Sequence, residues 1–263
     1  SGIELWGFDL VMAGNIKGYH DLRSNPVDII PEADKRRLDY RMCAAYTDGT
    51  KLNIEMSVIA NARGLRTDVP GMHGPPAKHV DDVLGLYDFD DLRAGGPVVD
   101  YILGAKPGGG VFAVGYHDQP FQKFMMDYYK LGSGPYYVFY RPYHLCHVES
   151  IASMVQPVLH GRGLIEMPER FTTNVFTRAK KPLKAGEMLD GIGGHCAYGL
   201  IENVSEANQD ALPICLAEDV RLKRDIPMDQ PITFADIEAP ADRLDFRLYA
   251  ESCKTADVEL ETH

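Results

Sequence analysis

The chain has 263 residues, of which 45% are hydrophobic and 25% are charged, so it carries enough apolar residues for a folded core. These values exclude a disordered tail, a collagen-like rod and a small disulfide-rich scaffold. The formal net charge of -11 argues against nucleic acid or an anionic membrane as the main partner. No segment approaches the ~20 consecutive apolar residues of a membrane span, and the first residues lack the pattern of a signal peptide.

The cysteines bear on the redox compartment of the protein, and the first residues bear on whether the chain is part of a longer protein. The five cysteines are scattered and form no C-x-x-C pair, which argues against a disulfide framework or a structural zinc site. We therefore expect a reducing, cytoplasmic setting. The chain opens with Ser1-Gly2 and runs at once into an apolar segment, so we expect the natural protein to extend upstream of residue 1.

The first predicted elements combine short strands and helices. An apolar run over residues 8–13 predicts a buried strand that ends in a glycine-containing turn at 13–18. Prolines in residues 21–31 predict a loop, and the spacing of apolar residues in 33–46 predicts a helix. A second helix is expected from Asp48 to a stop at Gly64.

Later elements follow the same mixed pattern. The glycine and proline content of residues 71–76 predicts a loop. Further helices are expected over residues 78–86, 119–130 and 147–160, and strands over residues 98–104, 111–117 and 136–140.

The pattern changes after Met167-Pro168. We expect strands at 174–180, 195–202 and 245–253, separated by many turns. The sequence therefore predicts a mixed α/β or α+β fold with a domain boundary near residue 168: residues 1–168 form a domain with a mixed sheet and helices, and residues 169–263 form a small β-rich domain.

The helix that begins at Asp48 carries the most informative charges. Asp48, Lys51 and Glu55 lie at positions i, i+3 and i+7, on one stripe of a helix that is apolar on several sides. One interpretation is a stripe facing a substrate cavity, with Lys51 as a proton donor or phosphate contact and a carboxylate near a metal. The other is that Asp48 caps the helix and Lys51 pairs with Glu55 at the surface.

Two further groups of residues could contact a ligand. Gly14, Asn15 and Lys17 belong to the turn expected at the end of a buried strand, where α/β sheets bind ligands, although a solvated glycine-rich turn is an alternative. Arg141 and His144 follow the strand expected at 136–140.

Arg141, the nearby histidines and Glu149 could bind a sugar phosphate, transfer protons or ligate a metal, or they could be core histidines and a carboxylate at a helix start. His73 lies in the 71–76 loop, and a loop bounded by glycine and proline could act as a lid. We find no dinucleotide fingerprint, P-loop, G-x-S-x-G or zincin motif.

Five segments together resemble one known family: AGNIKGYHD, EADKRRLDYRMCAAYTDGTKLNIEM, GMHGP, YYVFYRPYHLCHVES and AKKPLKAGEMLDGIGG. The sequence is similar to the homoserine-dehydrogenase-like oxidoreductases that end in a SAF domain, a family that includes a deoxyxylulose-phosphate reductoisomerase-like enzyme of isoprenoid biosynthesis. The last segment resembles the SAF module, and the TDGTK helix resembles the catalytic part. The Rossmann domain that precedes these parts in the family has no counterpart in this chain.

The resemblance implies reduction of a carbonyl group with hydride from NADPH or NADH. It implies cofactor contacts at Gly14 and Asn15 and catalytic roles for Lys51, Asp48, Glu55 and Lys17. For a reductoisomerase-like member, a Mg²⁺ or Mn²⁺ ion held by Asp48 and Glu55 would bridge substrate oxygens.

The expected substrate is a small polyhydroxy or phosphorylated carbonyl compound, contacted by Arg141, His144 and His73, and the expected assembly is a homo-oligomer. Two alternatives stay open. One is a non-catalytic, SAF-type sugar-binding or assembly module, and the other is a homoserine dehydrogenase.

Overall fold

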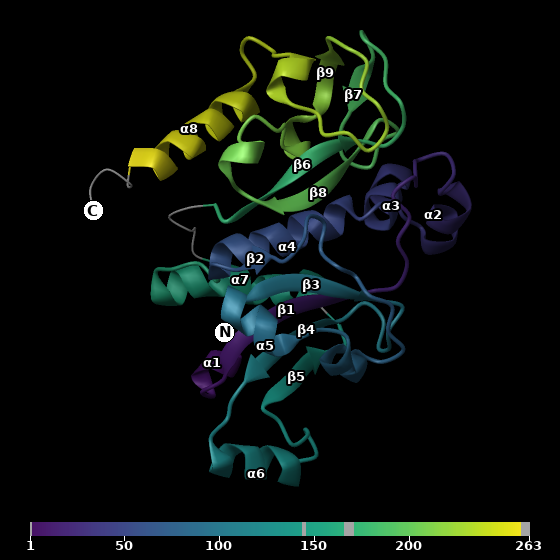
Figure 1. Cartoon of the computed structure of the whole chain (residues 1–263). Coiled ribbons are helices and arrows are strands. Elements are labelled where there is room, and N and C mark those ends of the chain that lie inside the picture. The colour runs from purple at the N-terminus through teal and green to yellow at the C-terminus, as the bar shows by residue number, and fades with distance from the viewer. Residues whose placement is uncertain (1, 144–145, 166–170, 259–263) are drawn as a thin grey trace. The chain divides into compact units, whose positions relative to one another are not determined.

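The chain forms two compact units, each built from two segments of sequence (Figure 1). Unit 1 consists of residues 1–19 and 62–168, and unit 2 of residues 20–61 and 169–263. The computed structural model describes residues 2–143, 146–165 and 171–258. The predicted domain boundary near residue 168 lies outside the described residues. The predicted mixture of helices with a mixed sheet is confirmed.

Unit 1 is organised around a five-stranded mixed sheet. Across the sheet the strands lie in the order β2 (Arg66–Thr67), β3 (Val98–Leu103), β1 (Asp9–Lys17), β4 (Val111–Tyr116) and β5 (Tyr136–Arg141). The pairs β2–β3 and β3–β1 are parallel, whereas β1–β4 and β4–β5 are antiparallel.

The central strand β1 is longer than predicted, and the turn expected at residues 13–18 is wrong. Gly14 and Asn15 lie inside the strand, and Lys17 is its last residue. A glycine inside a strand marks a place where a neighbouring group approaches the backbone closely. Here the neighbour is the ring of Phe112, because a Cβ atom on Gly14 would lie only 2.1 Å from it.

Different helices cover the two faces of this sheet. One face packs against the 3₁₀-helix η1 (Val80–Gly85) and the helix α5 (Phe89–Gly95), with β1 residues Met12 and Ile16 in that core. The other face is covered toward the amino end of β1 by apolar groups of α1 (Gly2–Leu5) and α6 (Pro120–Tyr128).

Unit 2 contains three helices from its first segment: α2 (Ile30–Arg36), α3 (Tyr40–Thr47) and α4 (Thr50–Arg63), the last of which ends in unit 1. The single helix predicted for residues 33–46 is wrong. Arg37 adopts a left-handed conformation (φ 56°) that ends α2, and the Asp39 side chain accepts a hydrogen bond from the Met42 N–H to begin α3.

Two small antiparallel sheets form the rest of unit 2. The pair β6 (Thr173–Ala179) and β8 (Ala197–Asn203) confirms the strands predicted at 174–180 and 195–202. The other sheet has the order β10 (Ile237–Glu238), β9 (Glu218–Leu222) and β7 (Met188–Asp190). Short 3₁₀-helices η2 (Glu206–Asn208), η3 (Ile214–Leu216) and η4 (Phe234–Asp236) connect these strands.

Helix α4 runs along β8 and β6 and hydrogen-bonds to both (Figure 1). The Thr50 hydroxyl accepts from the Gly199 N–H at 2.9 Å, and the Asn53 side chain accepts from the Ile201 N–H at 2.9 Å. One and two turns later, Ser57 and Asn61 bond to the start of β6. These four residues form one stripe of the helix, which satisfies backbone groups at the strand edges.

The strand predicted at residues 245–253 is wrong, because this segment belongs to the helix α8 (Leu244–Val258). Phe246 and Tyr249 lie three residues apart, as helical neighbours do, and both rings pack near Phe234. The short alternation of apolar and polar residues in this segment is typical of a strand. The three-residue spacing of Phe246 and Tyr249, however, is helical and brings both rings to Phe234.

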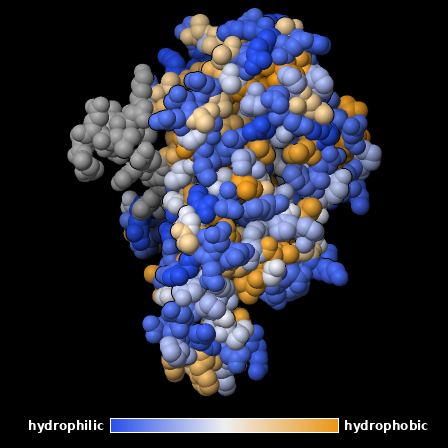
Figure 2. Space-filling model, in the orientation of Figure 1, coloured by the Kyte–Doolittle hydropathy of each residue, from blue (hydrophilic) through white to orange (hydrophobic). Residues whose placement is uncertain are grey.

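The surface seen in Figure 2 is mostly hydrophilic, with hydrophobic side chains scattered over it, and a few of them lie at the bottom, where Figure 1 shows α6. Phe121, Phe124 and Tyr128 of that helix are exposed. Among the described residues, no helix has the length and apolar character needed to cross a membrane.

The contact between Gly14 and Phe112 gives a test of the fold. Gly14→Ala should reduce the free energy of unfolding by about 1–3 kcal/mol, because a methyl group would be forced into the ring. Gly18→Ala is the control, since a Cβ atom there would have no neighbour within 4 Å. Urea unfolding of both variants measures the difference, and equal stability would contradict this packing.

Candidate functional site

Strand register places several polar residues on one face of the unit 1 sheet. Asn15 pairs with Tyr101 on β3 and with Val111 on β4, and Val111 pairs with Arg141 on β5. Paired residues in neighbouring strands point to the same side of a sheet. Tyr101, Asn15, Val111 and Arg141 therefore form one row across four strands.

Lys17 extends this polar region to the end of β1. It lies two residues after Asn15, so its side chain points to the same face. It pairs with Leu103, the last residue of the parallel strand β3. Ligands of open α/β sheets bind beyond the carboxyl ends of parallel strands, which is where Lys17 lies.

Arg141 lies two strands from Asn15 in the row, which corresponds to about 10 Å between their backbones. Its guanidinium pairs with the carboxylate of Glu149 and lies 5.5 Å from the centre of the Tyr143 ring. The Arg141 side chain is 55% exposed, so it is accessible to a ligand. Asn15, Lys17 and Arg141 thus share one face and one end of the sheet.

Gly14 faces the opposite side of the sheet from Asn15. Its Cα lies under the Phe112 ring, within the apolar core that η1 and α5 cover. The structure therefore gives Gly14 a packing role, and the expected contact with a cofactor stays a prediction.

The loop that carries His73 is tied to the buried carboxylate of Asp100. Asp100 accepts hydrogen bonds from the backbone N–H groups of His73, at 3.1 Å, and Gly74, at 3.0 Å. Burial raises the pKa of Asp100, and these backbone donors act in the opposite direction. Gly74 lies directly against the ring of Tyr101, so the loop lies beside the same row as Asn15.

The imidazole ring of His73 forms a hydrogen bond with an acidic side chain. Its Nε2 lies 2.9 Å from Oδ2 of Asp68. Hydrogen bonds from Arg66 and from His73 lower the pKa of Asp68. His144, the second predicted histidine, lies outside the described residues.

In unit 2, Asp48 is completely buried and both its carboxylate oxygens have partners. Oδ1 accepts from the Thr50 N–H at 2.8 Å, at the start of α4, and Oδ2 lies 2.8 Å from Nζ of Lys180. The same ammonium donates to the carbonyl oxygens of Ser24, at 2.7 Å, and Gly194, at 2.8 Å. All three N–H bonds of Lys180 are therefore satisfied, and the pair joins α4 to two loops of unit 2.

Lys51 of α4 is half-buried and contacts Tyr46 of α3. Its Nζ donates to the Tyr46 hydroxyl at 2.6 Å and lies 3.9 Å from the centre of that ring. Glu55 is half-buried one turn farther along the helix. Asp48 is thus fully buried, whereas Lys51 and Glu55, expected on the same stripe, are both half-buried.

The arrangement does not favour Asp48 as a metal ligand. A divalent cation would have to displace the Lys180 ammonium, which occupies one oxygen, and the helix N–H, which occupies the other. Within the described residues, no three His, Cys, Asp or Glu side chains are grouped so that they could hold a metal ion.

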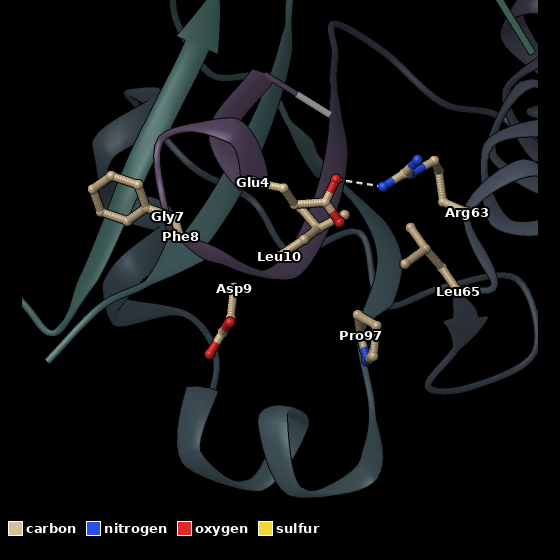
Figure 3. A pocket seen from close by; sticks show the side chains of 8 residues that line it. All are labelled: Glu4, Gly7, Phe8, Asp9, Leu10, Arg63, Leu65 and Pro97. Atoms are coloured by element: carbon tan, nitrogen blue, oxygen red, sulfur yellow. Dashed lines mark hydrogen bonds and ion pairs between the residues drawn. The ribbon is translucent and has the colours of Figure 1, made fainter.

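A pocket of about 410 Å³ lies at the opposite end of the unit 1 sheet (Figure 3). It is lined by Glu4, Gly7, Phe8, Asp9, Leu10, Arg63, Leu65 and Pro97. Glu4 and Arg63 form an ion pair across it. Asp9 begins β1 and Pro97 precedes β3, so the pocket lies at the amino ends of the parallel strands, away from Lys17.

Sequence reasoning missed three groups that shape these sites: Tyr46, Asp100 and Lys180. Lys180 was part of a predicted strand, and only the fold shows that it meets a residue 132 positions earlier. Asp100 could have been found from the sequence. It is the one acidic residue in the apolar strand VVDYIL, and acidic residues are rarely buried without a partner.

Comparison with known proteins gives one family. The family model described as "Oxidoreductase DRL, catalytic domain" matches residues 3–150. No curated protein shows significant similarity to the chain.

The buried pair predicts an asymmetric effect of substitution. Asp48→Asn should cost about 3–5 kcal/mol of unfolding free energy, because it leaves the Lys180 ammonium buried without a counter-charge. Adding Lys180→Met should recover part of that loss. Lys184→Met is the control, because its pair with Asp225 is exposed and should change stability by less than about 1 kcal/mol. Denaturant unfolding that shows additive losses at Asp48 and Lys180 would contradict the coupling.

Proposed function

Since the chain belongs to the DRL oxidoreductase catalytic-domain family, whose model covers more than half of its residues, we propose that it supplies substrate-binding and proton-transfer groups to an NAD(P)H-dependent oxidoreductase. The observation that supports the proposal is that Asn15, Lys17 and Arg141 lie on the same face and at the same end of the unit 1 sheet. The substrate is a small polyhydroxy or phosphorylated carbonyl compound.

The charges on this face support a phosphorylated substrate. Lys17 and Arg141 are both cationic, and an arginine guanidinium can bind a phosphate through two parallel hydrogen bonds. Arg141 already holds one carboxylate, that of Glu149, at a half-exposed position. A substrate phosphate can exchange with that carboxylate at little cost, because an exposed ion pair contributes little free energy. A ketose phosphate of the deoxyxylulose type fits this description.

Lys51 is the proposed proton donor. During reduction of the substrate carbonyl, the carbonyl oxygen would take a proton from the Lys51 ammonium, and the neutral Lys51 amine would then take a proton from water. The Tyr46 ring and hydroxyl hold this ammonium in one orientation. Tyr46 is thus a positioning residue.

Asn15 is the residue of unit 1 best suited to contact a nicotinamide. The cofactor supplies the hydride when it is bound. The Asn15 side chain points to the same face as Lys17, and a carboxamide can both donate and accept hydrogen bonds to a second carboxamide. No step is assigned to a metal, because both oxygens of Asp48 are engaged.

Substitution of Lys51 tests the proton-transfer role. In the full-length enzyme, Lys51→Met should lower kcat by about 10²–10⁴-fold while leaving the unfolding curve nearly unchanged, since Lys51 is only half-buried. Tyr46→Phe, which removes the hydrogen bond and keeps the ring, should cause a smaller loss. Oxidation of NADPH in the presence of deoxyxylulose 5-phosphate and other small carbonyl phosphates measures the rate.

Lys35→Met is the matched control, because this lysine is 76% exposed and pairs only loosely with Glu32. Unchanged turnover in Lys51→Met would remove Lys51 from the mechanism. NADPH oxidation with none of the phosphorylated carbonyl compounds would contradict the proposed substrate class.

A further inference from the structure

The pocket at the amino end of the unit 1 sheet lies far from Lys17, at the carboxyl end (Figure 3). All of its lining residues belong to unit 1. Its volume of about 410 Å³ falls within the range of small-molecule binding sites. Asp9 lines the pocket and Lys17 ends the same strand, so about 26 Å of β1 separates them. The pocket is therefore a second candidate site.

A step in the sheet forms one wall of the pocket. Pairing between β1 and β3 begins at Met12 and Val98, so residues 9–11 of β1 continue past the start of β3. Pro97, which immediately precedes β3, and Leu10 of β1 both line the pocket. The opening at this place therefore follows from the register of the two strands.

Two opposite charges meet across the pocket. The carboxylate of Glu4, on α1, and the guanidinium of Arg63, the last residue of α4, form an ion pair, and Figure 3 shows them pointing toward one another. Their side chains are 38% and 44% exposed, so a ligand can reach both. Asp9 adds a second, more exposed carboxylate, which lies 3.8 Å from the guanidinium of Arg93. The pocket thus offers a cationic and an anionic group side by side.

The remaining side chains of the pocket are apolar, and they form what we call the apolar wall: Phe8, Leu10, Leu65 and Pro97. Phe8 and Leu65 are buried, whereas Leu10 and Pro97 are half-buried. Phe8 belongs to a packed cluster, and Leu10 packs against that cluster. Because packing already orders these side chains, a ligand that covers them loses little affinity to ordering the wall.

The ion pair disfavours ligands that carry a single charge. An anion on Arg63 would be repelled by the neighbouring Glu4 carboxylate, and a cation on Glu4 would be repelled by Arg63. A zwitterion satisfies both groups, because its carboxylate pairs with the guanidinium and its ammonium pairs with the carboxylate. Opening the existing pair costs little, since exposed ion pairs contribute little free energy. The apolar wall adds a preference for a zwitterion with an apolar substituent.

We propose that this pocket binds a free α-amino acid with an apolar side chain. The carboxylate of the amino acid binds Arg63, its ammonium binds Glu4, and its side chain covers the apolar wall. The site is separate from the cationic end of the sheet at Lys17, and its occupation does not require turnover of an oxidoreductase substrate. The exposure of its charges makes it a weak site, with a dissociation constant of about 1 mM.

Backbone NMR signals of the 263-residue chain, followed as L-leucine is raised to about 20 mM, test this proposal. We expect saturable shifts at the residues that line the pocket and none at Lys17. Two analogues separate the contributions of the charges: 4-methylpentanoate is leucine without the ammonium, and 3-methylbutylamine is leucine without the carboxylate. Each should bind at least about tenfold more weakly than leucine.

Substitution of either charged residue should have the matching effect. Arg63→Gln should weaken leucine binding at least about tenfold, and Glu4→Gln should act in the same direction. Both variants remove only an exposed ion pair, so the signals of the rest of the chain should show an intact fold. Arg36→Gln is the matched control, because Arg36 forms an exposed pair with Glu32 outside the pocket, and it should leave the dissociation constant unchanged.

Absence of shifts at about 20 mM leucine would overturn the proposal, and so would shifts centred on another part of the chain. Equal affinity for leucine and either analogue would also contradict it, since binding would then not use both charges. Equal effects of Arg63→Gln and Arg36→Gln would count against it as well, because the loss would then reflect the overall charge of the chain.

Discussion

Alternation of side chains along β1 is the constraint on which unit 1 depends. A strand sends successive residues to opposite faces, so Met12, Gly14 and Ile16 pack into one apolar core while Asn15 and Lys17 point to the other side. The residues of β1 that pack in the core and those that we propose to bind a ligand are therefore on opposite faces of the sheet. A one-residue shift in register would bury Lys17 and expose Ile16, so the same pairing that stabilises the sheet also fixes the position of the polar groups.

In unit 2 the comparable constraint is the start of α4. Asp48 caps the helix and neutralises Lys180, so one carboxylate satisfies a backbone N–H and a buried ammonium at once. The polar stripe from Thr50 to Asn61 then ties the helix to β8 and β6. Lys51, the proposed proton donor, lies outside this stripe and is half-buried.

Local patterns predicted more of the fold than of the site. Apolar runs located β3, β4, β6 and β8, because strong periodicity survives tertiary context. They failed where a single residue decided the outcome, as at Arg37, whose left-handed backbone divides one predicted helix in two. For the site, the sequence identified candidate residues by type, but it did not identify the residues that they contact in the fold. The stripe of Asp48, Lys51 and Glu55 looked uniform in sequence, yet Asp48 meets Lys180, a contact between residues 132 positions apart that no local pattern encodes.

Binding of inorganic phosphate to the 263-residue chain tests the central claim, that the carboxyl end of the unit 1 sheet is the anion-binding part of an oxidoreductase site. Backbone NMR signals would be followed as phosphate is raised to about 20 mM, a range suited to weak binding. The account predicts the largest shifts at Lys17, Gly18 and Arg141, and their loss in Lys17→Met. Shifts centred instead on Arg63 and Glu4, in the pocket at the other end of the sheet, would contradict it.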